Sequence, residues 1–406
     1  MKTMRSLRRG LAAVAILAGA ACSGKAQVST SLVRSSDPHL AALASKLLPD
    51  LARRAGLELH RPVRIEKRNR AQLERYLRHK LDQDLPEALA REKVQSYALL
   101  GLVPDTLNLR ALLLALYAEQ VAGFYDPDST ALFVMDDQPE SQLKTVLVHE
   151  LVHAVQDQTV NLNALTDPRR GNDRVTAAEA AIEGEATLVM IEYMTEQMQG
   201  GPVDLSNLPG FTADLRPNVE AMKKQFPALA NAPLVIQESL LFPYVAGTGF
   251  VLDLWRKNKG KRVAPFGPYL PQSTQQVITH DLSDKPVDVK LDITGARVLH
   301  EDDLGRLEAG VFMETHVGKL PAGFWKPWGG DRYALVETPD GARGLVWVTV
   351  WDDPAGRDSF IHQASPALSR LPQPATLTAI SAGGRPAAVL RVRAPRSVTL
   401  TASIGP

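Results

Sequence analysis

Three titratable side chains inside one apolar segment constrain this chain more than any other feature. Apart from His149, Glu150 and His153, every residue from Val146 to Val155 is apolar, which is typical of a helix buried on all sides. Burying an unpaired polar group costs on the order of a few kcal/mol, and burying a charge costs more. The segment therefore predicts a buried helix whose polar side chains share a partner.

The spacing of the two histidines favours a metal ion as that partner. His149 and His153 lie four residues apart, so on a helix both imidazoles project from the same face. Two imidazoles placed in this way can occupy two tetrahedral positions of one Zn²⁺, and Glu150 beside them can act as general base toward a metal-bound water. The alternative is a pair of histidines hydrogen-bonded into the core, with Glu150 at its edge.

Three carboxylates downstream offer a third metal ligand. Glu179, Glu183 and Glu185 fall within the alanine-rich segment 177–186. The HExxH motif together with Glu183-Gly184-Glu185-Ala186 resembles the gluzincins, zinc metallopeptidases with a downstream glutamate ligand, some of which carry the same Glu-Gly-x-Ala string. The resemblance implies Glu183 as the ligand. Glu179 is the alternative, because other gluzincins place an acidic residue one turn after the ligand.

The same resemblance implies further parts of a catalytic site. Glu150 would take a proton from water and pass it to the leaving amine, and a donor would stabilise the developing oxyanion. Tyr244 and His280 are the candidates for that donor, and each is equally well explained as a packing residue. The strand Ala131–Met135 would be the edge strand to which an extended peptide adds. Asp157 is expected to be a solvated acid.

The first 22 residues are typical of an export signal. A basic region within residues 2–9 precedes an apolar run over residues 11–18, which is too short for a stable membrane span. Cys22 follows Leu17-Ala18-Gly19-Ala20-Ala21, which resembles a bacterial lipobox. We expect an exported envelope protein that is lipid-anchored to a membrane through Cys22, facing the periplasm or the cell exterior. The alternative is ordinary secretion after cleavage near Ala20 or Ala21.

Composition narrows the remaining possibilities. With 406 residues, 45% of them hydrophobic, the chain is long enough for two or three packed units. A formal net charge of +1 excludes a nucleic-acid footprint, so no nucleic-acid partner is expected. Because Cys22 is the single cysteine, a disulfide is excluded and metal ligands must come from His, Asp and Glu.

Hydrophobic periodicity predicts an α+β chain. Helices are expected at 38–57, 71–81, 107–120, from about 137, at 176–198 and over part of 234–257. Strands are expected at 63–66, 121–125, 131–135, 287–293, 332–338 and 344–351, and as a hairpin over 375–393. The predicted organisation is a signal peptide of lipoprotein type (1–22), a flexible tether (23–37), a zincin-like metallopeptidase domain (38–285) and a smaller C-terminal α+β domain (286–406). In the zincin-like domain we expect a small N-terminal sheet with an edge strand, the HExxH helix and a second ligand helix.

The tryptophans of the C-terminal part are expected to form a core, with a ligand platform as the alternative. Trp328-Gly329-Gly330-Asp331-Arg332-Tyr333 and the motifs above resemble a group of bacterial exported or lipid-anchored proteins of uncharacterised activity, which often carry Glu-Gln and His-Pro where this chain has Gln275-Gln276 and His280-Asp281.

Two functions of different classes are compatible with these patterns. The first is a zinc-dependent peptidase that hydrolyses envelope or secreted polypeptides. The second is a zincin-fold lipoprotein that keeps the metal but serves as a non-catalytic binding or assembly factor. The choice between endopeptidase and aminopeptidase stays open, with Glu119 as a candidate for fixing a substrate amine.

Overall fold

The structure is a computed structural model that describes residues 32–207, 211–394 and 397–405. The predicted signal peptide, Cys22 and residues 23–31 of the predicted tether lie outside these ranges. The helices are α1 Pro38–Ala55, α2 Arg70–Asp84, α3 Glu87–Leu99, α4 Leu109–Gln120, α5 Glu140–Thr159, α6 Leu162–Leu165, α7 Asn172–Gln199, α8 Phe211–Lys223, α9 Pro227–Ala230, α10 Leu234–Lys257, α11 Thr274–Thr279, α12 Gly305–His316 and α13 Pro354–Ala364. The strands are β1 Val33–Ser35, β2 Val63–Arg68, β3 Gly123–Asp126, β4 Ala131–Met135, β5 Val289–Thr294, β6 Arg297–Asp302, β7 Trp328–Glu337, β8 Arg343–Trp351, β9 Ala375–Ala382, β10 Arg385–Val392 and β11 Thr399–Ile404.

Four short strands form the sheet of the N-terminal part, in the order β1-β2-β4-β3. β2 is parallel to β1 and to β4, while β3 and β4 form an antiparallel hairpin, as the sequence predicts. The predicted edge strand is wrong, because Ala131–Met135 lies between two neighbours, and the edges are formed by β1 and by Gly123–Asp126. The predicted tether is also too long, since Val33–Ser35 pair with β2 and residues 33–35 therefore belong to the sheet.

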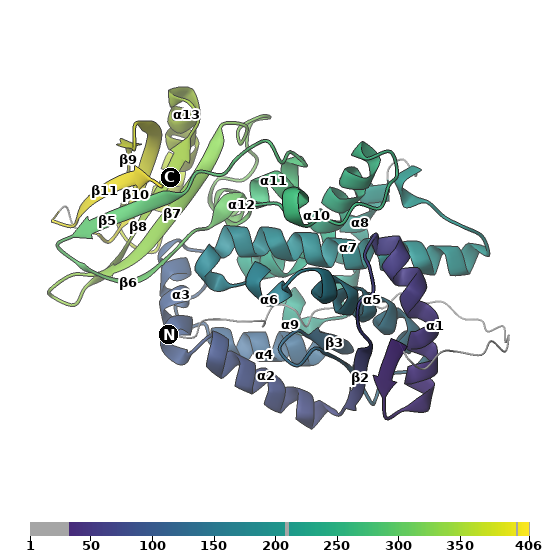
Figure 1. Ribbon diagram of the computed structural model, residues 1–406. Coiled ribbons are helices and arrows are strands. Elements are labelled where there is room, and N and C mark those ends of the chain that lie inside the picture. Colours follow the sequence, from purple (N-terminus) through teal and green to yellow (C-terminus); the bar gives the residue numbers. More distant parts are fainter. Residues whose placement is uncertain (1–31, 208–210, 395–396, 406) are drawn as a thin grey trace.

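Helices cover both faces of this sheet (Figure 1). On one face, Leu132 and Val134 pack with α1, α5 and α7. On the other face, Phe124 and Phe133 pack with α2 and α4, as expected from the alternation of side chains along a strand. Helix α5 thus lies between the sheet and α7, and this position explains why its sequence is apolar on all sides.

The long helices α7 and α10 cross at very close range. A Cβ added to Gly184 would lie 2.2 Å from the carbonyl carbon of Gly247, and a Cβ on Gly247 would lie 2.1 Å from the carbonyl oxygen of Ala180. Only glycine permits this approach. The expectation that 234–257 is helical only in part is wrong, because α10 is one continuous helix with Pro243 inside it. Although α10 is long and apolar enough to cross a membrane, most of it is buried within the fold.

The C-terminal part contains a five-stranded antiparallel sheet, in the order β6-β7-β8-β10-β9, and a separate β5–β11 pair. Trp328, Trp347 and Trp351 are almost completely buried. Trp347 meets Phe312 of α12 edge-on, with ring centroids 5.2 Å apart, and Trp351 lies 5.3 Å from Phe360 of α13. The tryptophans therefore form a core, as expected, and the alternative of a ligand platform is wrong for these three.

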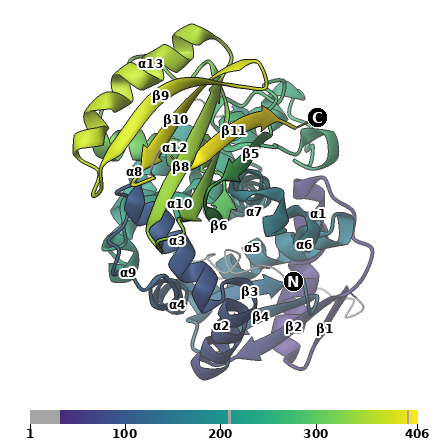
Figure 2. The same ribbon diagram turned by 90° about the vertical axis from the view of Figure 1, so that its left-hand side faces the viewer.

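The expected boundary at residues 285/286 falls between α11 and β5, but hydrophobic packing continues across it. One cluster joins side chains of α2, α3 and α4 to α12 and the five-stranded sheet. Tyr97 Oη of α3 donates to Glu308 Oε2 of α12 at 2.8 Å, and Figure 2 shows α3 beside that sheet. The chain is a mixed α+β protein whose two parts share a core.

Candidate metal centre

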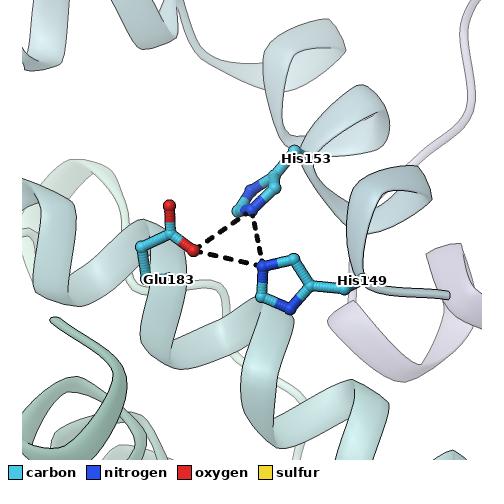
Figure 3. Close-up of side chains that lie close together, drawn as sticks. All are labelled: His149, His153 and Glu183. Atoms are coloured by element: carbon cyan, nitrogen blue, oxygen red, sulfur yellow. Dashed lines mark hydrogen bonds and ion pairs between the residues drawn. The ribbon is translucent and has the colours of Figure 1, made fainter. Parts of the chain in front are cut away.

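Three side chains from two helices converge in the interior. Helix α5 supplies His149 and His153, and α7 supplies Glu183 (Figure 3). The two Nε2 atoms lie 3.0 Å apart, and Glu183 Oε2 lies 3.1 Å from that of His149 and 3.3 Å from that of His153. All three side chains are buried. The structure thus brings together the residues that the sequence offers as metal ligands.

This triangle of donor atoms has the size of a metal site. Tetrahedral coordination with bonds of 2.0–2.1 Å separates neighbouring ligand atoms by about 3.3–3.4 Å. Hydrogen bonds alone cannot account well for the three short contacts among these atoms, because each Nε2 carries at most one hydrogen and can donate to only one of its two neighbours. If both imidazoles donate to Glu183, two donors face each other at 3.0 Å. A cation would satisfy the lone pairs of His149, His153 and Glu183 together.

Gln156 fixes the orientation of one imidazole. Its amide nitrogen donates to Ile182 O at 3.0 Å and to Glu185 Oε2 at 2.9 Å, so its oxygen faces His153 Nδ1 at 2.8 Å. Because an amide oxygen only accepts, Nδ1 carries a hydrogen, and Nε2 is the atom of His153 that a metal would bind. Such partners of metal-binding histidines set both tautomer and ring angle.

Glu150 lies next to the triangle with half of its carboxylate in use. Its Oε2 accepts the backbone N–H of Tyr125, in strand β3, at 2.8 Å. Its Oε1 is buried and has no hydrogen-bond partner among the described residues. Burial, reinforced by the nearby charge of Glu183, raises the pKa of Glu150 to about 8. Glu150 is therefore held from one side and keeps one oxygen available.

Tyr244 reaches the centre from the third helix, α10. Its ring centroid lies 6.3 Å from that of His149. The hydroxyl is buried, and within the part of the chain that the structure describes it has no hydrogen-bond partner. Burial and the charges of Glu183 and Glu150 hold the pKa of Tyr244 well above its ordinary value, so the phenol stays a donor.

The structure does not bring His280 to this centre. His280 follows α11, with Nδ1 3.8 Å from Asp253 Oδ2. Asp253 lies nine residues beyond Tyr244 on α10, which is about 13 Å along the helix axis. His280 is therefore the C-cap residue of α11 beside the far end of α10, and its predicted role as a donor to the oxyanion is wrong.

The two alternatives for the third ligand are also separated in space. Glu183 belongs to the group of potential ligand atoms that lie within 4.8 Å of one another, whereas Glu179 does not. Glu179 lies one turn earlier on α7 and lines a neighbouring cavity. Glu119, the candidate for fixing an amine, instead accepts the backbone N–H of Ala228 at 3.1 Å.

One prediction near the site is wrong and two supporting residues were missed. Asp157 is not solvated, since its carboxylate is mostly buried and accepts from Tyr125 Oη at 2.8 Å and pairs with Arg61 at 3.3 Å. No role was predicted for Gln156, and Glu185 was predicted only as one of three possible ligand carboxylates, whereas it accepts from Gln156. Gln156 could have been noticed, because it lies three residues after His153 and hence on the same face of α5.

Comparison with known proteins bears on the C-terminal part. A family model described as "Domain of unknown function (DUF8575)" matches residues 297–404, which covers less than half of the chain. No curated protein and no solved structure matches the sequence. The metal centre lies outside the matched residues.

Proposed function

We propose that this protein is a zinc-dependent peptidase with a zincin-like catalytic domain. One observation carries the proposal: two histidines and a glutamate form a buried triangle of donor atoms with edges of 3.0–3.3 Å, beside a carboxylate with one oxygen that has no hydrogen-bond partner among the described residues. Two histidines with one glutamate form a ligand set that zinc uses in metallopeptidases, where the fourth position stays open for water or substrate. The sheet, the HExxH helix α5 and the ligand helix α7 are the parts expected of that fold.

The side chains around the triangle fit hydrolysis. A zinc ion held by His149, His153 and Glu183 would supply Lewis acidity toward water and a peptide carbonyl. The positive charge of a bound zinc would favour the ionised form of Glu150, which is fixed through Oε2 and could then accept a proton from the attacking water at Oε1 and deliver it to the leaving amine. The protonated hydroxyl of Tyr244 can donate to the developing oxyanion.

An extended polypeptide would have to add at the edge strand β3, whose four residues are all buried in this structure. β3 contacts α5, and one of its backbone N–H groups holds Glu150. Main-chain pairing to an edge strand binds peptides without strong dependence on their sequence. The role assigned to Ala131–Met135 thus passes to Gly123–Asp126. Together with the export signal and Cys22, this favours polypeptides of the cell envelope as substrates and a lipid-anchored location.

Metal content tests the centre directly. Purified protein from residue 23 onward is loaded with zinc, dialysed and measured by mass spectrometry, alongside Glu183→Ala and Glu179→Ala. We expect near-stoichiometric zinc in the wild type and in Glu179→Ala, and its loss in Glu183→Ala. A wild type that stays metal-free after loading would refute the metallopeptidase.

Hydrolysis is tested on the same samples with a fluorescently labelled, unfolded polypeptide. We expect activity that is lost with a chelator, restored by zinc and absent in Glu183→Ala. Stoichiometric zinc without hydrolysis of any polypeptide offered would instead support the non-catalytic binding or assembly factor.

A further inference from the structure

A cavity of about 450 Å³ lies between the metal centre and the C-terminal part of the chain. Four helices supply most of its lining at helical spacing, and the first of them, α3, provides Leu89, Lys93 and Tyr97. α4 provides Leu109, Leu113 and Tyr117; α7 provides Asn172, Val175 and Glu179; α10 provides Ile236, Ser239 and Leu240. Cavities of about 300–1,000 Å³ are typical ligand sites, so the space is large enough for a substrate segment.

The inner end of the cavity adjoins the metal centre. On α7, Glu183 lies one turn beyond Glu179, and on α10, Tyr244 lies one turn beyond Leu240. Tyr244 is close enough to feel the charges of Glu179, Glu183 and Glu150 together, and it also interacts with Tyr117 of the cavity wall. None of the side chains of the triangle lines the cavity itself, but Glu179 and Leu240 do, so a ligand in the cavity would lie about one helical turn from the triangle.

The lining favours an uncharged, apolar ligand. Its floor is mainly leucine and isoleucine, while the charged groups of the wall are engaged with one another. Lys93 pairs with Asp302 at 2.9 Å, and Arg332 pairs with Glu301 at 2.7 Å. Burial lowers the pKa of His300 to about 4, so this imidazole is neutral near pH 7. These ion pairs neutralise Lys93, Asp302, Glu301 and Arg332, while the carboxylates of Asp84, Glu179 and Glu308 also reach the lining and disfavour an acidic ligand.

The outer wall comes from the matched C-terminal domain. His300, Glu301 and Asp302 end strand β6, and Arg332 lies on β7. Glu308 of α12 accepts from Tyr97 Oη at 2.8 Å and from Ser239 Oγ at 3.0 Å, which fastens this wall to α3 and α10. The wall is thus held rigidly against the helices that carry the metal centre.

We propose that this cavity binds a large apolar side chain of the polypeptide substrate beside the bond to be cut, and that the C-terminal domain is the wall that selects it. The link to cleavage rests on the proposed peptidase function, whereas binding in the cavity does not. The domain of unknown function thereby gains a role in substrate recognition.

Binding is measured without turnover. The probes are two fluorescently labelled hexapeptides with blocked ends, which differ only in a central leucine or alanine, and the protein is zinc-loaded Glu150→Gln. By fluorescence anisotropy, we expect the leucine peptide to bind about tenfold more tightly, since burying the larger side chain favours it. Leu113→Trp, which fills the cavity, should abolish the preference. Leu114→Trp, on the same helix but outside the lining, should keep it.

The wall is tested by removing one ion pair. The double variant Glu301→Ala/Arg332→Ala has a larger cavity at this wall. We expect a peptide with a central tryptophan to bind the double variant at least threefold more tightly than it binds the protein with the intact ion pair. Equal affinity for the leucine and alanine peptides would refute binding of an apolar side chain in the cavity. A leucine preference that is unchanged in Leu113→Trp would refute it as well. If the tryptophan peptide binds the double variant no more tightly, the C-terminal domain does not select the bound side chain.

These outcomes are separable from those of the proposed function. Leucine-dependent binding without hydrolysis by the wild type refutes the peptidase and leaves the cavity standing. Hydrolysis without an apolar preference, read from the cleavage sites in a peptide mixture, refutes the cavity and leaves the peptidase standing.

Discussion

Two buried carboxylates, one in each part of the molecule, are used in opposite ways. Asp331 of β7 accepts from the backbone N–H groups of Leu304 and Gly305 and from Trp347 Nε1, at 2.7–3.0 Å. Glu150 of α5 accepts from one backbone N–H at 2.8 Å, and its second oxygen has no partner in the described ranges. Both are deeply buried, and burial raises the pKa of both.

The difference separates a structural carboxylate from a reactive one. The hydrogen-bonding capacity of Asp331 is occupied in joining the start of α12 to the sheet. Glu150 is buried although one of its oxygens lacks a hydrogen-bond partner among the described residues, which is energetically unfavourable. Buried polar groups of this kind are typical of functional sites. Changes at Asp331 should therefore alter stability, and changes at Glu150 should alter chemistry.

The largest effect is expected from Glu150→Gln. Removing the general base should lower the rate of polypeptide hydrolysis by about 100- to 10,000-fold, while zinc content and melting temperature stay close to those of the wild type. Initial rates, metal analysis and thermal unfolding on one preparation check all three. A variant that retains full activity would contradict the role of Glu150.

Asp331→Asn should change how stability depends on pH. The folded-state pKa of Asp331 is raised to about 7, above the unfolded value of about 3.9, so its stabilising contribution is present below pH 4 and is lost as the pH rises to 7. Relative to the variant, the wild type should lose up to about 4 kcal/mol over this range, at about 1.36 kcal/mol per pKa unit. Urea unfolding of both proteins between pH 4 and 8 measures this loss. Parallel curves of unfolding free energy against pH for the wild type and Asp331→Asn would contradict the prediction.

Gly247→Ala should disrupt the crossing of α7 and α10. Its Cβ would lie 2.1 Å from Ala180 O, so the helices must separate, and we expect a loss of about 3 kcal/mol of unfolding free energy. Gly201→Ala is the matched control, because its Cβ meets nothing within 4 Å. Urea unfolding of both variants provides the measurement. Equal stability of the two would mean that the crossing tolerates a side chain.

The smallest effect is expected from Gln156→Ala. Without the amide oxygen, His153 Nδ1 loses the partner that sets its tautomer, and zinc affinity should fall by about 10- to 100-fold. Competition with a zinc-binding dye measures the affinity. If Gln156→Ala binds zinc as tightly as the wild type, the orienting role is wrong.

The sequence was informative where the signal is local. Two histidines four residues apart must share a helix face, and a strand such as Gly344–Trp351 is recognisable from its β-branched and aromatic residues, so these features could be derived without coordinates. The turn at Gly383-Gly384 between β9 and β10 is a signal of the same kind.

The sequence was uninformative where distant segments decide the outcome. The edge position of Gly123–Asp126 depends on the parallel pairing of β2 with β4, which leaves no mark in either strand. Pro243 and the nearby glycines suggested an interrupted helix, but packing against α7 keeps α10 continuous. His280 was a candidate because the gluzincin resemblance implies a Tyr or His as oxyanion donor, and its position beside the end of α10 could not be derived from the sequence.

The core shared between the two parts has a consequence for the order of folding. Tyr97 meets Glu308 across 211 positions, and Arg343 reaches Gln95 across 248. Contacts this far apart close late, since the chain loses loop entropy before they contribute. The wall beside the metal centre can therefore form only after nearly the whole polypeptide has been synthesised. A chain emerging in order has its ligand helices long before it has a closed site, and this delay separates synthesis of the ligands from assembly of the complete cavity.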